Sequence, residues 1–252
     1  MSAEATEAAH TVASRVSARI DRIFASVDEQ GRAIAHWLAA HPSPSVAELD
    51  RVVGDLVIEH LQPTSLVTGA GFVVAPGLLR DAHWHLAWWL GGHTALRRLT
   101  TSDDPQSEDF RDYTALEWFR YPERTGSRHL TGPYVDYLCT DDYTITVTAP
   151  VMVAGRMAGV VGADALVDRL ENALLPELRT MAGRATLVAA SGRVLVSTDA
   201  RVQPGSMLRI AGLGDALLPL RAAGSAAVDH LLPDGGRVVS CGATSLALVT
   251  ET

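Results

Sequence analysis

The amino-acid sequence predicts an α+β fold in which one long helix precedes two groups of antiparallel strands, the first group larger than the second. Three observations predict it: an amphipathic pattern fills positions 5–41, strand patterns begin at residue 66, and a further helical pattern at 166–181 separates the strand groups. We therefore expect an N-terminal helical segment at 1–60, a larger strand-rich module at 61–178 and a smaller module at 179–252.

The first helix is predicted by apolar residues at steps of three and four, with charged residues between them: Val12, Val16, Ile20, Phe24 and Val27. The stretch HPSPS at 41–45 ends this helix, and Ser45 is suited to cap a second one. A helix of this length either packs along its own domain or pairs with its copy in a homodimer. We favour packing on its own core and keep the homodimer as an alternative.

The first strand group is predicted by stretches of alternating or β-branched residues between glycine and proline signals. HWHLAWWL at 83–90 is one such strand, and a polar loop follows at 100–109. The stretch at 110–126 predicts a short helix that runs into a loop at Pro122. The remaining strands of this group are TGAGFVVAPGLL at 68–79, YTITVTAPVMV at 143–153 and GRMAGVVGADAL at 155–166.

The second strand group follows the helix at 166–181. RATLVAASGRVLVSTD predicts a hairpin that turns at Ser191 and Gly192. A second hairpin is predicted to turn at Asp234, Gly235 and Gly236, and a closing strand ends the chain. These hairpins make the second sheet antiparallel.

Composition narrows the range of expected partners and locations. The 252 residues are 47% hydrophobic and 20% charged, with a formal net charge of −8, so a nucleic-acid partner is not expected. No stretch is apolar enough for a signal peptide or a membrane span, so we expect a soluble, cytoplasmic protein without a membrane partner. Cys139 and Cys241 lie far apart in the sequence, which favours two reduced thiols.

Signals for catalysis are weak. The sequence holds no glycine-rich phosphate loop, nucleophile elbow or zinc-protease helix, so no catalytic residue and no cofactor are expected. His83 and His85 would point the same way on a strand, with His93 beyond them. Two imidazoles hold a metal only if another ligand joins them, so a metal-dependent enzyme remains an alternative.

Aromatic and acidic residues cluster in the centre of the chain. GPYVDYLCTDDYTITVTAPV at 132–151 brings Tyr134 and Asp136 close to a strand, and Trp118 and Phe119 precede it. Asp164 ends the apolar stretch GVVGAD, where an ionised carboxylate is costly unless backbone donors or a cation satisfy it. Asp164 is therefore either a helix cap or part of a cation pocket, and the aromatic residues either pack in the core or line that pocket.

The stretch from Trp118 to Leu170 resembles the membrane-distal module of double Cache (PDC-like) sensor domains. The matching elements are the aromatic pair Trp118–Phe119, then GPYVD, YTITVTAPV, a turn and GVVGAD. The resemblance implies a long N-terminal helix with two PAS-like antiparallel-sheet modules. It also implies a non-enzymatic domain that serves signal transduction and binds its ligand in the larger module at 61–178.

In the amino-acid-binding branch of that family, the resemblance implies that Tyr134 and Asp164 hold the ligand's ammonium group. The carboxylate clamp of that branch includes an arginine two residues before the tryptophan, where this sequence has Leu116. Without that guanidinium, a ligand carboxylate loses its bidentate partner, which favours an amine without a carboxylate. The expected ligand-binding residues are Trp88, Glu117, Trp118, Phe119, Tyr121, Tyr134, Asp136 and Asp164.

The sequence therefore predicts a sensor for a small organic amine or quaternary ammonium ligand that signals to an unidentified partner. One alternative is an amino-acid or carboxylate sensor in which Arg111, Arg120 or Arg124 replaces the clamp. A closing loop at 120–131 and the N-terminal helix are the expected moving parts.

Overall fold

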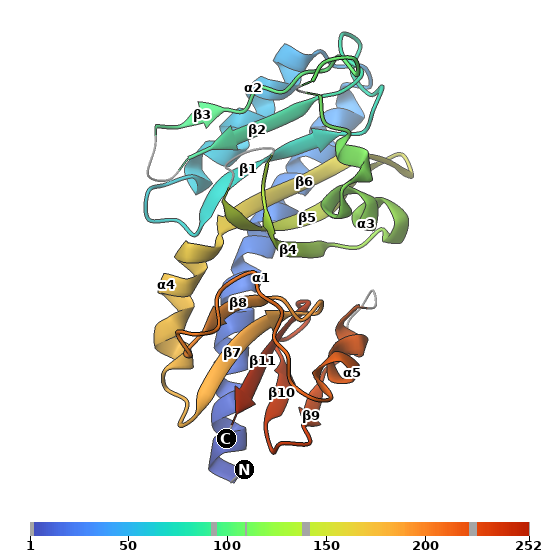
Figure 1. Ribbon diagram of the computed structural model, residues 1–252. Helices are drawn as coiled ribbons and strands as arrows, with labels where there is room; N and C mark the ends of the chain where they lie inside the picture. The colour runs from blue at the N-terminus through green and yellow to red at the C-terminus, as the bar shows by residue number, and fades with distance from the viewer. Residues whose placement is uncertain (1–2, 92–94, 109, 138–141, 222–225, 252) are drawn as a thin grey trace.

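The computed structural model describes residues 3–91, 95–108, 110–137, 142–221 and 226–251 (Figure 1). Helix α1 (Ala3–Ala40) lies along two antiparallel sheets, of which the six-stranded one comes first in the chain and the five-stranded one second. The predicted α+β fold with two sheet modules is confirmed.

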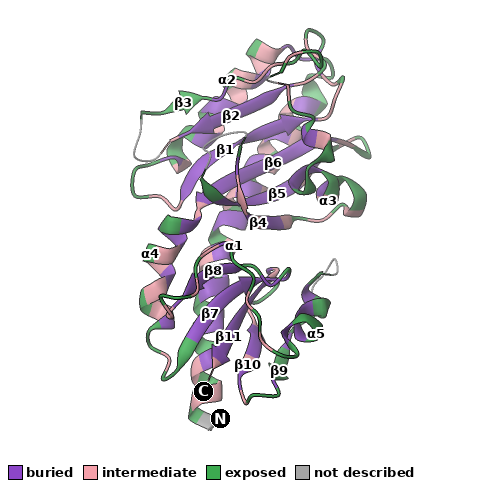
Figure 2. Cartoon of the chain, viewed as in Figure 1, coloured by how far each residue is buried: buried purple, intermediate pink, exposed green. Residues whose placement is uncertain are grey.

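Helix α1 is long because its apolar stripe is buried along its whole length. Ile20, Val27 and Ile34 are completely buried in one hydrophobic core that also contains residues of both sheets. The stripe therefore packs on the chain's own core, and Figure 2 shows the buried strands beside this helix. A homodimer through α1 stays a prediction.

Helix α2 (Val46–Val57) begins where the sequence predicts. The hydroxyl of Ser45 accepts a hydrogen bond from the backbone N–H of Glu48, and the Glu48 carboxylate accepts one from the backbone N–H of Ser45. This reciprocal pair satisfies two backbone donors at the helix start. A 3₁₀ turn (η1, Ile58–His60) follows α2 and leads to the first sheet.

The six-stranded sheet has the strand order β3-β2-β1-β6-β5-β4. Its strands are β1 (Val67–Val74), β2 (Leu86–Leu90), β3 (Arg97–Arg98), β4 (His129–Val135), β5 (Tyr143–Val153) and β6 (Arg156–Leu166). The hairpin turn between β5 and β6 has left-handed backbone at Ala154 and Gly155, as a two-residue hairpin turn requires. The predicted strand at 83–90 begins three residues later, at Leu86.

The alternation in β5 separates the two faces of this sheet. Ile145, Val147 and Val151 belong to the core shared with α1, whereas Thr146 and Thr148 point to the opposite face. That opposite face carries a second cluster of buried residues with Trp88, Trp118 and Phe119. The candidate site lies on this face.

Helix α3 (Glu117–Thr125) lies over the same face and follows a 3₁₀ turn (η2, Tyr113–Ala115). The expectation that the helix ends in a loop at Pro122, within a loop at 120–131, was wrong: Pro122 lies inside α3, and β4 begins at His129. Proline cannot donate to the carbonyl four residues earlier, which belongs to Trp118. The hydroxyl of Thr148 donates to that carbonyl at 2.8 Å, so the helix continues.

The five-stranded sheet has the order β8-β7-β11-β10-β9 and follows helix α4 (Val167–Leu178). Its elements are β7 (Arg184–Ala189), β8 (Val194–Ser197), α5 (Leu213–Leu217), η3 (Leu218–Arg221), β9 (Asp229–Leu231), β10 (Arg237–Ser240) and β11 (Leu246–Glu251). The two predicted hairpin turns lie between β7 and β8 and between β9 and β10. Cys241 is a buried free thiol, and Cys139 lies outside the described residues.

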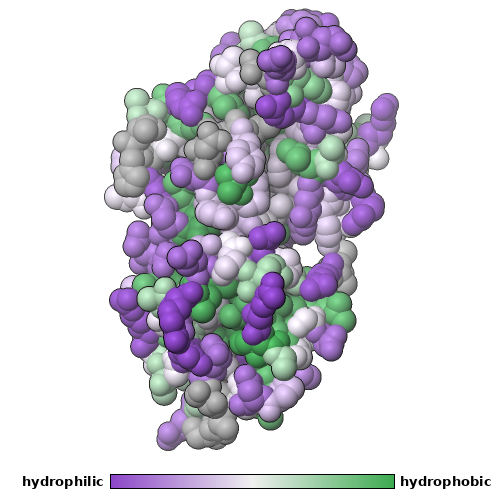
Figure 3. Space-filling view, viewed as in Figure 1, coloured by the Kyte–Doolittle hydropathy of each residue, from purple (hydrophilic) through white to green (hydrophobic). Residues whose placement is uncertain are grey.

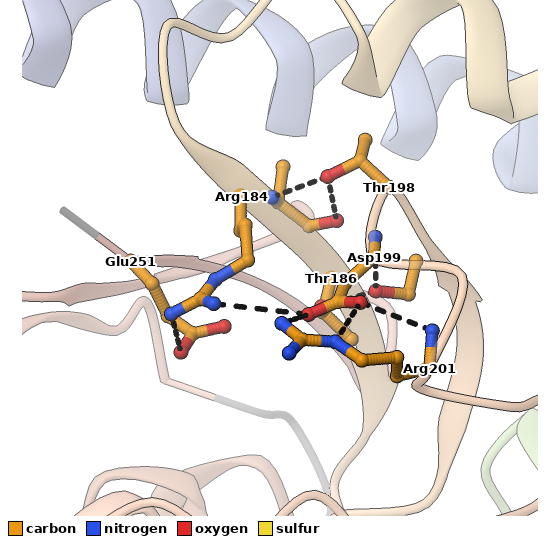
Figure 4. A network of polar contacts seen from close by, with 8 residues as sticks. Arg184, Thr186, Thr198, Asp199, Arg201 and Glu251 are labelled. Atoms are coloured by element: carbon orange, nitrogen blue, oxygen red, sulfur yellow. Dashed lines mark hydrogen bonds and ion pairs between the residues drawn. The ribbon is translucent and has the colours of Figure 1, made fainter.

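An ion-pair network joins the end of β8 to β7 and β11 (Figure 4). Asp199 accepts two hydrogen bonds from the Arg201 guanidinium, Arg184 lies 3.8 Å from Asp199, and Arg184 also donates to Glu251 at 3.1 Å. Hydrogen bonds from Arg201 hold the pKa of Asp199 well below its usual range. The network therefore ties together neighbouring ends of β7, β8 and β11.

Replacing Thr148 by valine should lower the free energy of unfolding by about 1–3 kcal/mol, because the Trp118 carbonyl then stays buried without a partner. Urea denaturation measures the loss. Thr144→Val is the matched control on the same strand, since the Thr144 hydroxyl makes only a long bond of 3.3 Å. Equal losses for both variants would contradict the role given to Thr148.

Candidate functional site

A small cavity lies on the face of the first sheet that is turned away from α1. Its walls come from strands β1, β2, β4, β5 and β6, from helix α3 and from the residue after β4. The lining residues are Val73, Leu86, Trp88, Trp118, Tyr134, Asp136, Thr146 and Asp164. We call this cavity the carboxylate pocket.

Three polar side chains form a chain of hydrogen bonds across the pocket. Thr146 and Asp164 are directly opposite each other on β5 and β6, and the Thr146 hydroxyl donates to the Asp164 carboxylate at 2.7 Å. The hydroxyls of Tyr134 and Thr146 are 2.6 Å apart. Because the Thr146 proton is engaged with Asp164, Tyr134 donates to Thr146, and the carboxylate is held in place from two strands.

Asp164 is an unusual carboxyl group. It is 5% exposed, and burial together with the nearby charge of Asp136 raises its pKa from 3.8 to about 8. The hydrogen bond from Thr146 opposes this rise only in part. The interpretation of Asp164 as a helix cap was wrong, because Leu166 occupies the N-cap of α4 and makes no side-chain cap. Two buried carboxyl groups that repel each other are suited to a cation.

The indole of Trp88 forms the floor of the pocket and rests on glycines of β1 and β6. A Cβ atom at Gly69 would lie 2.9 Å from the Trp88 indole nitrogen and 3.1 Å from an Asp164 carboxylate oxygen. A Cβ atom at Gly71 or Gly162 would also meet the ring, at 2.9 and 3.3 Å. These glycines were not among the expected site residues, although their alternate spacing in TGAGF marks one face of a strand.

The pocket gathers five of the eight expected residues and leaves three outside. Trp88, Trp118, Tyr134, Asp136 and Asp164 line it, together with Thr146, which was not expected. Phe119 is completely buried in the adjoining core. Tyr121 stacks on His129, and Glu117 pairs with His129 at 3.0 Å; both line a different and larger cleft.

No arginine lines the carboxylate pocket within the described part of the chain. Arg111 is bonded to the carbonyls of Glu108 and Phe110, Arg120 is exposed, and Arg124 lines the larger cleft. None of the three arginines that could replace the clamp reaches Asp164. The cavity itself measures about 20 Å³, room for about one water molecule, so an organic ligand requires the walls to move apart.

The predicted histidine pair is not arranged for a metal. His85 lies 2.8 Å from Asp50 and 3.4 Å from an Arg98 nitrogen, while His83 is exposed at the surface. Among the residues that the structure describes, which exclude His93, no group of three His, Cys, Asp or Glu side chains is placed to hold a metal ion. In the same described residues, no helix is both long and apolar enough to span a bilayer.

Comparisons with known proteins agree with this architecture. Residues 57–172 match the family model described as the methyl-accepting chemotaxis protein-like, first PDC sensor domain. Residues 57–172 are therefore similar to a PDC sensor domain. They include all of the first sheet and the carboxylate pocket. No curated protein matches the sequence.

Solved structures extend the likeness of fold to nearly the whole chain. Methyl-accepting chemotaxis protein X aligns with a TM-score of 0.71 at 18% identity, over 99% of this chain and 96% of that one. The extracellular domain of a histidine kinase aligns with a TM-score of 0.62 at 17% identity, over 98% and 95%. The ligand-binding domain of the Pseudomonas aeruginosa PAO1 amino-acid chemoreceptor PctC, solved with GABA, gives 0.55 at 18% identity, over 97% of each chain. All of these show the same two-module fold.

The contribution of Asp164 to the free energy of unfolding should decrease as pH rises from 3.8 to about 8, because the folded state then holds a proton on Asp164 that the unfolded state has lost. Asp164→Asn removes this contribution, so the variant should gain stability relative to the wild type across this range. Each unit of pKa shift corresponds to about 1.4 kcal/mol. Urea denaturation at several pH values measures the difference. Asp55→Asn, at an exposed position, is the control. A pH profile for Asp164→Asn that runs parallel to the wild-type profile would contradict the raised pKa of Asp164.

Gly69→Ala should displace the Trp88 indole and the Asp164 carboxylate, because its methyl group would lie closer to both than atoms normally approach. We expect a loss of about 1–3 kcal/mol in the free energy of unfolding and a change in tryptophan fluorescence. Gly214→Ala is the control, since nothing lies within 4 Å of a Cβ atom there. An unchanged fluorescence spectrum for Gly69→Ala would show that the floor is not tightly packed.

Proposed function

We propose that this chain is the ligand-binding part of a sensor that recognises a small organic amine or quaternary ammonium compound in the carboxylate pocket. The observation that carries the proposal is the pair of buried carboxyl groups, Asp136 and Asp164, beside the aromatic rings of Trp88, Trp118 and Tyr134. A cation placed between them relieves their mutual repulsion. It also meets the negative faces of the rings, each contributing about 0.5–2 kcal/mol when water is excluded.

The absence of an arginine from the described lining supports an amine rather than an amino acid. A ligand carboxylate next to Asp164 would add a third negative group without a bidentate partner. The alternative has its own support: PctC is described as an amino-acid chemoreceptor and was solved with GABA, and the Pseudomonas fluorescens chemoreceptor CtaA was solved with L-serine. An amino acid would bind here only if the larger cleft supplied an arginine to its carboxylate.

Transmission of the binding event is proposed to follow α1. Thr146 belongs to β5, and the opposite face of β5 packs on α1 through Ile145 and Val147. A ligand that separates the walls of the pocket would shift β5 and β6, and this displacement reaches the helix shared by both modules. The signalling partner, a homodimer through α1, the cytoplasmic location and the lack of enzymatic activity remain predictions.

The test uses choline and its neutral carbon isostere 3,3-dimethylbutan-1-ol, with GABA and L-serine for the alternative. At a concentration of about 100 times its dissociation constant, a ligand stabilises the folded state by about 2.7 kcal/mol, which a thermal-shift assay detects. We expect choline or simple alkylamines to raise Tm and the neutral isostere to leave it unchanged. Equal shifts by the isostere would contradict a cation pocket, and shifts by the amino acids alone would favour the alternative.

The pH dependence of binding tests whether the ligand binds beside Asp164. A quaternary ammonium ion keeps its charge at every pH, so its affinity should rise with pH until Asp164 is ionised in the free protein, near pH 8. Calorimetry in buffers of different ionisation enthalpy should show that one proton is released on binding at pH 6. Asp164→Asn should lower the affinity at least about tenfold and abolish this proton release. An Asp164→Asn variant that binds as tightly as the wild type would place the ligand elsewhere.

A further inference from the structure

A second cavity lies between the two modules and has a volume of about 880 Å³. Its upper wall is made by α3 and β4 of the first module, and its lower wall by the β7–β8 turn, η3 and the turn before β11. Figure 3 shows that this face of the molecule is hollowed where the two modules meet. We call this cavity the intermodule cleft.

The cleft is basic, although the chain as a whole is acidic. Each module contributes two arginines, Arg124 and Arg128 from the first and Arg193 and Arg221 from the second. Glu117 is the one carboxylate in the described lining, and it is paired with His129. Against a formal net charge of −8 for the chain, this is a local reversal of sign.

Three of these arginines have no carboxylate partner in the described structure. Arg128 lies between Asp21 at 3.5 Å and Asp28 at 3.8 Å on α1, and its charge is balanced there. In contrast, the described residues contribute no ion pair to Arg124, Arg193 or Arg221.

The two arginines of the second module are held in place by backbone groups. A terminal nitrogen of Arg193 donates to the Gly205 carbonyl at 2.9 Å, and Nε of Arg221 donates to the Ala190 carbonyl at 3.0 Å. Each guanidinium keeps further N–H donors for a ligand. Fixed guanidinium groups lose little entropy when they bind an anion, so they are better suited to recognition than freely rotating ones.

The opposite wall adds a neutral donor and an apolar surface. Thr131 is 7% exposed and lines the cleft, and its buried hydroxyl has no hydrogen-bond partner among the described residues. Leu130, Pro133 and Leu220 also line the cleft. A purely inorganic anion would leave these apolar side chains without a partner.

We infer that the intermodule cleft binds a small organic anion that carries at least two carboxylate or phosphate groups. Arg193 and Arg221 hold one charged end against the second module, and Arg124 of α3 holds the other against the first. Bidentate pairing of guanidinium with carboxylate or phosphate supplies the specificity. Of its described lining, the cleft shares only Tyr134 with the carboxylate pocket, and anion binding there does not depend on the proposed amine ligand.

The test is isothermal titration calorimetry of the whole chain at low salt with citrate and with fructose 1,6-bisphosphate, and with glycerol as the uncharged probe. Saturable binding of one molecule of citrate or of the bisphosphate is expected, and the stronger of the two identifies the acidic group. Glycerol should give no signal. If neither anion binds saturably at millimolar concentration, the proposal is overturned.

Variants assign the binding to the cleft. Arg124→Gln and the double variant Arg193→Gln with Arg221→Gln should each weaken anion binding at least about tenfold. Arg120→Gln is the matched control, because Arg120 lies on the same helix as Arg124 but outside the cleft. Asp164→Asn should bind the anion as the wild type does. An equal loss for Arg120→Gln, or a loss for Asp164→Asn, would contradict the proposed site.

Discussion

The burial of one apolar stripe of α1 against both sheets is the constraint on which the rest of this structure depends. At about 1.5 Å per residue, a helix of 38 residues spans nearly 60 Å, which is longer than either sheet alone requires. Its completely buried side chains, from Ala9 to Ile34, belong to the same core as β1 and β6 of the first sheet and β7 and β11 of the second. Because the modules share this core, neither can move without changing its packing on the helix.

In this arrangement, the two faces of the first sheet have different roles. One face of β5 and β6 supplies isoleucine, valine and alanine to the common core, and the other supplies threonine, glycine and aspartate to the carboxylate pocket. Because successive side chains of a strand point to opposite faces, one stretch of sequence supplies both faces. The buried threonines of the polar face have partners: the Thr146 hydroxyl bonds to Asp164 and Tyr134, and the Thr148 hydroxyl donates to the Trp118 carbonyl that Pro122 leaves unbonded. Neighbouring threonines of β5 therefore hold both the pocket carboxylate and helix α3 in place.

Local pattern predicted the regular elements well, because amphipathic spacing, glycine turns and the Ser45 cap act within a few residues of one another. The helix at 5–41 and the strands at 143–153 and 155–166 agree with the structure to within about two residues. The end of the helix near Pro122 was mispredicted because the hydroxyl that donates to the Trp118 carbonyl belongs to Thr148, which is distant in sequence.

The candidate site was predictable only in its charged and aromatic members. Asp136, Asp164 and Tyr134 are unusual enough in their local sequence to attract attention, and the structure brings them together. Tyr121 and Glu117 are neighbours of Trp118 in sequence, but they contact His129 at the edge of the intermodule cleft instead. The glycines under Trp88 were missed, because which ring covers a glycine depends on the pairing of β1 with β2 and β6.

For the proposed sensor, the size of the carboxylate pocket limits how quickly a ligand can be registered. A cavity of about 20 Å³ is too small for an organic ligand, so only those protein molecules in which the pocket walls have moved apart can bind one. The closed population lowers the apparent affinity, and the opening rate sets an upper limit to the rate of response at high ligand concentration. A receptor of this kind would register sustained concentrations and ignore changes that are briefer than its own opening.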